Sequence, residues 1–180
     1  MGVLTGEELA REPFLHGMRR ADLTRLATAG RRVTIPAAHR ICAEGRPAEH
    51  FWIIDAGTVT VDLRLPDRRA IIESLGPGSV LGWSWLFQPR RWSYGAVTDT
   101  PVDAIEFDGR LVRTLCAVDT SLGYELTRRF AELVVERLHA TRVGLLEPVT
   151  ASHGAHAPQG RHAKNPGRSA PCASTADARP

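Results

Sequence analysis

Cysteine and long apolar runs are scarce in this chain of 180 residues, and each shortage excludes a class of protein. No stretch approaches the roughly 20 apolar residues that a membrane-spanning helix needs, and residues 1–20 lack the apolar core of a secretion signal. Three widely spaced cysteines, Cys42, Cys116 and Cys172, suit neither a disulfide framework nor a zinc knuckle. We therefore expect a cytoplasmic protein without a membrane segment.

The positive charge of the chain comes from 22 arginines and the single lysine Lys164, and it is unevenly distributed. Residues 1–148 carry 19 arginines against 19 acidic residues, whereas residues 149–180 have a net charge of +3. A neutral core lacks the basic surface with which proteins attract a nucleic acid. We therefore expect no specific DNA binding by this chain alone.

What the chain does contain is a stretch, residues 35–87, in which short apolar runs alternate with glycine-containing turns. Phe51–Asp62 predicts two strands joined by a turn at Asp55-Ala56-Gly57, where Asp and Gly tolerate a positive φ. Arg69–Leu75 predicts a further strand, which Gly76-Pro77-Gly78 must end because proline has no N–H to donate. Short strands with frequent turns predict a β-roll or barrel rather than a parallel sheet.

Helical spacing of apolar residues flanks this stretch. Residues 7–30 predict one or two short helices, and residues 111–118 predict another. A long helix is expected over residues 121–147, ended by Pro148. Residues 149–180 form a tail with almost no large apolar residue. Burial of so little apolar surface cannot compensate for the conformational entropy lost on folding, so we predict that the tail is disordered. The predicted parts are a helical lead-in at 1–34, a β-roll with its pocket at 35–118, the long helix at 119–148 and the tail at 149–180.

The apolar stripe of the long helix has two interpretations. Its early residues can hold the helix against its own roll. A helix of about 26 residues spans roughly 39 Å, however, which is longer than a small domain can cover. We expect the later residues to pair with a second copy, giving a homodimer through helix 121–147. The residues assigned to the roll are Leu122, Leu126 and Phe130, those assigned to the dimer are Leu138, Thr141 and Leu145, and the charged residues expected to face solvent are Arg128, Arg129, Glu132, Glu136, Arg137 and Arg142.

The order of these parts resembles the regulatory domains of the Crp/Fnr family, which are cyclic nucleotide-binding domains. The resemblance covers roughly residues 13–148 and rests on Glu44-Gly45, Ile54–Gly57, Gly78–Gly82 and Thr98–Val102 at family-like spacing. It implies a mainly β fold with flanking helices (α+β), a cyclic nucleotide-binding-like β-roll or double-stranded β-helix. Transcription factors of that family continue into a helix-turn-helix, which the tail of this chain does not resemble.

The resemblance also implies where a ligand would bind. In that family, a short helix that starts at the glycine matching Gly82 holds the cyclic phosphate. The acid after that glycine binds the ribose, and an Arg-Ser or Arg-Thr pair binds the phosphate. Here Trp83 replaces the acid, no other carboxylate follows nearby, and Trp92 precedes Ser93 in place of the arginine. Loss of the acid costs about 1.5 to 3 kcal/mol, or roughly ten- to hundredfold in affinity, so we expect weak or lost cAMP binding. The candidate ligand-binding residues are Gly82, Trp83, Ser84, Trp85, Arg90, Arg91, Trp92 and Ser93.

Two functions remain open at this point. The aromatic residues near Arg90 and Arg91 suit a flat ligand with an anionic group, a cyclic nucleotide or another anionic small molecule. The chain would then be a stand-alone sensor module that acts through a protein partner. Alternatively, the same rings fill the pocket, and the chain is a structural dimerising module. No nucleophile elbow, Walker loop or zincin motif occurs, and His39 and His50 are too isolated for a cupin metal site, so we predict no enzyme and no metal site.

Overall fold

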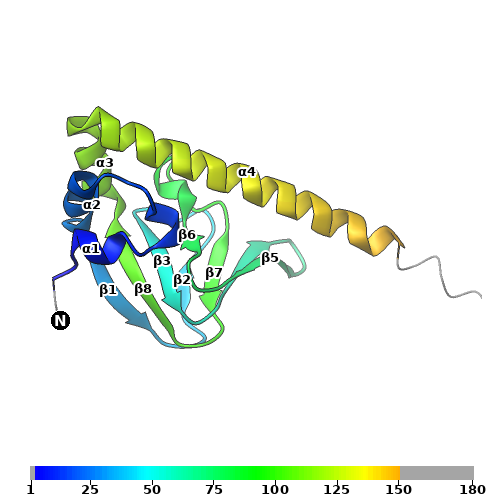
Figure 1. The fold of residues 1–180 in the computed structure, drawn as a ribbon. Helices are drawn as coiled ribbons and strands as arrows, with labels where there is room; N and C mark the ends of the chain where they lie inside the picture. Colours follow the sequence, from blue (N-terminus) through cyan, green and yellow to red (C-terminus); the bar gives the residue numbers. More distant parts are fainter. Residues whose placement is uncertain (1–2, 151–180) are drawn as a thin grey trace, which may run out of the picture. The chain divides into compact units, whose positions relative to one another are not determined.

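A computed structural model of the protein describes the backbone of residues 3–150 and the side chains through residue 139. Two four-stranded antiparallel sheets face each other in a β-roll (Figure 1), one with the order β1-β8-β3-β6 and the other with the order β2-β7-β4-β5. The predicted β-roll with flanking helices is therefore confirmed. The strands are β1 Gly30–Ile35, β2 Arg40–Cys42, β3 His50–Ala56, β4 Val59–Arg64, β5 Arg69–Leu75, β6 Val80–Leu81, β7 Gly95–Thr98 and β8 Val102–Asp108.

Short helices precede the roll, and two further helices follow it. The first is fixed by a capping box, in which the Thr5 hydroxyl accepts from the N–H of Glu8 at 3.3 Å and the Glu8 carboxylate accepts from the N–H of Thr5 at 2.8 Å. Asp108 caps the helix after β8 by accepting from the N–H groups of Arg110 and Leu111. The helices are α1 Gly6–Leu9, η1 Pro13–Leu15, α2 Arg20–Ala27, η2 Trp83–Trp85, α3 Gly109–Val118 and α4 Thr120–Thr150, where η denotes a 3-10 helix.

The turn at Asp55-Ala56-Gly57 carries the chain from one sheet to the other. β3 pairs with β6 and β8, whereas β4 pairs with β5 and β7. Gly57 has a φ of +88°, and a Cβ there would lie 2.3 Å from the carbonyl oxygen of Pro101. Only glycine fits this position without strain, so the turn is confirmed at Gly57, whereas Asp55 and Ala56 still belong to β3.

Aromatic rings make the centre of the core and join α4 to the roll. Phe51 stacks on Phe107 at 4.6 Å and on Trp85 at 4.9 Å between ring centroids, and the ring of Phe130 meets Phe51 edge-on at 5.3 Å. Phe130 lies on α4 and is fully buried, as are Leu122 and Leu126. The prediction that the early turns of the long helix pack on the roll is confirmed.

Two boundaries differ from those predicted. β1 begins at Gly30, inside the segment 1–34 predicted as helical lead-in, because the alternating residues after it pair in register with β8. α4 runs two residues past Pro148, to Thr150, since a proline removes one intrahelical donor and need not end a helix in its last turn. The side chains of Thr141 and Leu145, and the tail from residue 151, lie outside the described residues. Over residues 3–150, no helix combines the length and hydropathy that crossing a bilayer requires.

Candidate ligand-binding site

The predicted site lies where β6 passes into η2. Gly82 joins these two elements with a φ of +93°, a left-handed conformation that favours glycine. A Cβ on Gly82 would lie 2.9 Å from the ring of Trp92. The chain thus uses a glycine here both for its backbone conformation and to admit the indole ring.

Side chains almost fill the space inside the roll at this point. The remaining cavity has a volume of about 20 Å³, and its lining includes Glu73, Gly82, Trp83, Ser84, Trp92 and Arg137. A volume of this size holds about one water molecule. Pockets for drug-sized ligands measure roughly 300 to 1,000 Å³. A ligand as large as a nucleotide therefore fits only if side chains move.

Three aromatic rings, those of Trp83, Trp92 and Tyr94, form part of the wall of this cavity. Trp92 is buried and stacks on Trp52 of β3 at 5.9 Å between ring centroids. Trp83 is half-buried and contacts Tyr94 edge-on at 6.5 Å. Trp92 is held by the neighbouring residues of the roll, whereas Trp83 keeps part of its ring accessible.

The predicted site residues separate into three groups. Gly82, Trp83, Ser84 and Trp92 line the cavity. Trp85 is completely buried in the aromatic core instead. The remaining three, Arg90, Arg91 and Ser93, are exposed and are not part of the lining. Ligand binding by any of these residues stays a prediction.

Backbone pairing holds the segment with the two arginines beside residues 45–48 and not in the lining of the cavity. The N–H of Ala48 donates to the carbonyl oxygen of Arg90 at 2.9 Å. The N–H of Trp92 donates to the carbonyl oxygen of Arg46, also at 2.9 Å. Arg91 donates its guanidinium N–H to the carbonyl oxygen of Gly45 at 2.8 Å. The segment carrying the arginines is thus fixed along the outside of the roll, next to residues 45–48.

Sequence reasoning missed the two charged residues that do reach the cavity, Glu73 and Arg137. Glu73 brings a carboxylate to the cavity from β5, although no carboxylate follows Gly82 nearby in the sequence. The pairing of β4 with β5 shifts register between Val61 and Asp62, so that Val61 pairs with Glu73 but Asp62 pairs with Ile71. A bulge of this kind redirects side chains, and it leaves Ile71 exposed while Glu73 lines the cavity.

Arg137 and Arg129 correct the expectation that the charged residues of the long helix face solvent. Their side chains are only 16% and 13% exposed. Arg129 donates to the carbonyl oxygens of Phe14 and His16 at 2.6 and 2.8 Å. Positions 126, 130, 133 and 137 fall on one helix face, so Arg137 continues the buried stripe that contains Leu126 and Phe130. This helical spacing is the signal that could have identified it.

The charged groups of Arg137 and Glu73 form an ion pair. The Arg137 Nη1 lies 3.4 Å from the Glu73 Oε1, and its Nη2 donates to the carbonyl oxygen of Val80. Burial lowers the pKa of Arg137, and the carboxylate of Glu73 opposes that shift. In the same cavity, burial raises the pKa of the Cys42 thiol to about 12, which keeps it protonated and unreactive.

A buried carboxylate, that of Asp62, lies close by but has a structural role. Asp62 accepts from the Arg40 guanidinium at 2.8 Å on both of its oxygens and from Arg69 at 3.3 Å. A Cβ on Gly95 would lie 2.3 Å from the Asp62 carboxylate. Two arginines therefore neutralise this group, and the neighbouring backbone closes around it.

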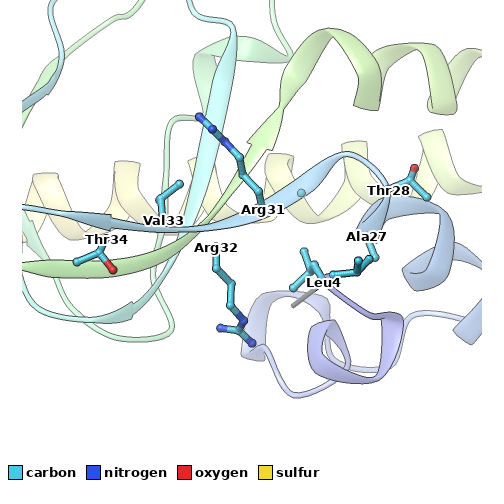
Figure 2. A pocket seen from close by; sticks show the side chains of 9 residues that line it. Leu4, Ala27, Thr28, Arg31, Arg32, Val33 and Thr34 are labelled. Carbon is cyan, nitrogen blue, oxygen red and sulfur yellow. The ribbon is translucent and has the colours of Figure 1, made fainter. Parts of the chain in front are cut away.

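A larger groove runs beside the edge strand β1 (Figure 2), with a volume of about 480 Å³. Arg31 and Arg32 extend from opposite faces of the strand. Arg31 pairs with Glu106 at 2.7 Å, and Arg32 pairs with Asp55 at 3.0 Å and with Glu8 at 3.1 Å. Because both arginines already have carboxylate partners, this groove lacks the convergent polar groups of a specific ligand site.

Comparison with known proteins supports the architecture. The sequence model of the cyclic nucleotide-binding domain family matches residues 32–119. The CRP-like cAMP-activated global transcriptional regulator of Mycobacterium tuberculosis is 28% identical over 142 residues, which are 78% of this chain and 62% of the regulator. The chain thus spans less than two thirds of the length of that relative.

Solved structures share the fold. A cyclic nucleotide-binding domain from Methylobacillus flagellatus has a TM-score of 0.66 and 20% identity, covering 73% of this chain and 74% of that one. The regulatory subunit of a cAMP-independent protein kinase A from Trypanosoma cruzi, bound to guanosine, has a TM-score of 0.53 and 25% identity. That similarity covers 66% of this chain and 47% of the subunit.

Proposed function

Because the sequence model of the cyclic nucleotide-binding domain family matches residues 32–119, we propose that this chain is a regulatory sensor module of that family in which cAMP binding is weakened or lost. It acts through protein partners and not by catalysis. Its ligand is a cyclic nucleotide or another anionic small molecule.

The observation that carries this proposal is the content of the pocket. Trp83 stands where the family has its ribose-binding acid, and Trp92 and Arg137 help to reduce the cavity to about 20 Å³. A cyclic nucleotide has to displace these side chains and then lacks a charged acceptor next to Gly82. Both effects lower the affinity for cAMP.

The half-buried ion pair favours a sensor over a permanently filled pocket. Removing a guanidinium and a carboxylate from water is costly, and apolar side chains of similar volume fill an interior at equal or lower cost. Arg137 and Glu73 nevertheless meet at the cavity. The guanosine-bound kinase subunit from Trypanosoma cruzi supports the idea that this fold accepts ligands other than cAMP.

Dimerisation through α4 is the second element of the proposal. Tyr124, Val135 and Leu138 lie on α4 with 72%, 51% and 51% of their surface exposed. Their spacing places them along one side of the helix. A second copy that packs on this side would bury them, and it would give the sensor an element through which its state reaches a partner.

The alternative function is a structural dimerising module with a closed, ligand-free pocket. The small volume of the cavity favours it directly, because nothing larger than a water molecule fits without movement. Under this alternative, the rings of Trp83 and Trp92 serve only to pack the roll.

Titration of tryptophan fluorescence separates the two functions, since Trp83 and Trp92 line the cavity. The probes are cAMP, cGMP, cyclic dinucleotides and guanosine at concentrations up to millimolar, with calorimetry as a second readout. We expect a saturable change with at least one anionic probe and a dissociation constant for cAMP no better than tens of micromolar. Sub-micromolar cAMP binding would refute the weakened site, and the absence of any saturable change would favour the closed module.

A further inference from the structure

The side chain of Arg137 stands between two hollows of the roll. Together with Glu73 it lines the inner cavity of about 20 Å³. The same two residues also line an outer groove of about 430 Å³, which is bordered by Val80 of β6 and by Leu133 of α4. The Glu73–Arg137 pair is therefore part of the wall of both hollows.

The Glu73–Arg137 pair is longer than an ideal charge-assisted hydrogen bond and is open on the Glu73 side. The two charged groups are 3.4 Å apart, whereas charge-assisted N–H···O bonds are usually 2.7 to 2.9 Å long. Glu73 is also the more exposed member, at 29% against 16% for Arg137. A buried guanidinium gains most from an anion that meets its planar N–H groups closely. The outer groove gives the Glu73 carboxylate room to withdraw.

The surroundings of Arg137 define the kind of anion that would fit. Trp83 and Trp92 present aromatic rings to the same cavity, and Ser84 contributes a hydroxyl group whose present acceptor is the Ser93 hydroxyl at 3.4 Å. Rings of this kind pack against flat ligands, and a hydroxyl group can donate to an anion. A flat aromatic molecule with a phosphate or carboxylate group satisfies all of these groups at once.

We propose that Arg137 is the anion-binding residue of this site, and that a flat organic anion binds by replacing Glu73 as its partner. The inference rests on the proposed sensor function and transfers the anionic contact from Arg90 and Arg91, which lie outside the cavity, to a residue of α4. Because Arg137 belongs to α4, exchange of its partner links occupancy of the site to the attachment of that helix.

The test uses Glu73→Gln in the full chain, with inorganic phosphate as the probe. The substitution removes the competing carboxylate and leaves the guanidinium in place. Thermal unfolding is followed in sodium phosphate and in sodium chloride of equal ionic strength. We expect phosphate to raise the Tm of this variant saturably, by about 5 °C or more at a hundredfold excess over its dissociation constant. The wild type should respond less, since Glu73 competes.

Two further variants control the experiment. Glu73→Gln combined with Arg137→Gln should show no phosphate-specific rise. Glu132→Gln removes an exposed glutamate of α4 that pairs with Arg128 at 2.6 Å, and it should behave as the wild type does. An equal phosphate response in the single and double variants would overturn the proposal. If Glu73→Gln has no cooperative transition in chloride, phosphate must restore one, and failure to do so also contradicts the proposal.

The fluorescence titration keeps this inference distinct from the sensor function. Phosphate-stabilised Glu73→Gln together with a wild type that binds no probe would refute the sensor and leave Arg137 as an anion site. A wild type that binds an anionic probe equally well after Arg137→Gln would refute the anion-binding role and leave the sensor intact.

Discussion

Replacement of Phe130 by alanine tests whether α4 is an integral part of the domain. The Phe130 ring is completely buried and lies 4.9 Å from Phe14, 5.3 Å from Phe51 and 5.4 Å from Trp85, measured between centroids. Phe→Ala substitutions in cores cost about 3 to 5 kcal/mol, because apolar contact is lost and a cavity remains. Three aromatic neighbours place this site toward the upper end of that range.

The assay is urea unfolding followed by circular dichroism, with thermal unfolding as a check. For a domain of this size, a loss of about 4 kcal/mol lowers the Tm by roughly 10 to 15 °C. Thr127→Ala, at an exposed position of the same helix, should change the free energy of unfolding by only about 0.5 kcal/mol. A loss below about 1 kcal/mol for Phe130→Ala would show that α4 does not stabilise the roll, and the reasoning about this helix would fail.

Three further predictions concern the dimer, the turn between the sheets and nucleic acid. Leu138→Glu with Leu145→Glu should give a folded monomer in light scattering, since the dimer would have to bury unpaired charges at a cost of several kcal/mol; a variant that is still dimeric, or a wild type that is monomeric, would refute the interface. Gly57→Ala should lower the free energy of unfolding by at least about 1 to 2 kcal/mol in urea titrations, because its Cβ would meet Pro101, and an unchanged midpoint would contradict the turn geometry. Mobility shifts should show no sequence-specific DNA complex at moderate salt, and a complex that survives salt and discriminates between sequences would overturn this expectation.

A pH-dependent prediction follows from the cap of α3. The N–H groups of Leu111 and Arg110 hold the pKa of the Asp108 carboxyl below its usual value. A carboxyl with a lowered folded-state pKa contributes stability above its unfolded pKa and loses it as the pH falls through the folded value. Asp108→Ala should therefore cost about 0.5 to 2 kcal/mol at neutral pH and less in acid. A pH-independent difference in unfolding free energy would contradict a charged cap.

Local features of the roll could be predicted from the sequence because single residues determine them. The turn at Gly57 needs a positive φ, and β5 ends where Gly76-Pro77-Gly78 interrupts the ladder. Helical periodicity likewise predicts which residues in the first turns of α4 are buried. Leu122, Leu126 and Phe130 follow this spacing, and all three are fully buried.

The composition of the site could not be predicted in the same way. Glu73 reaches the cavity because a register shift redirects β5. Helical spacing places Arg137 on the buried face of α4, but which part of the roll it reaches depends on how that helix packs. Both causes are tertiary, and the two residues are far apart in the sequence. Arg90 and Arg91 were misleading for the opposite reason, since they are close to the site in sequence but are held outside by pairing with residues 45–48.

The residues that close the site come from both the roll and α4, and this couples ligand binding to the packing of that helix. Trp83 and Glu73 come from the roll, whereas Arg137 comes from the helix that also presents Tyr124 and Leu138. A ligand that changes the partner of Arg137 changes the free energy of attaching α4 to the roll. If α4 also carries the dimer interface, the two equilibria are thermodynamically linked. Ligand binding then changes the dimerisation constant by a certain factor, and dimerisation changes the ligand affinity by the same factor. A monomeric Leu138→Glu, Leu145→Glu variant should thus differ from the wild type in its affinity for any anionic probe, whereas identical affinities would mean that site and interface are independent.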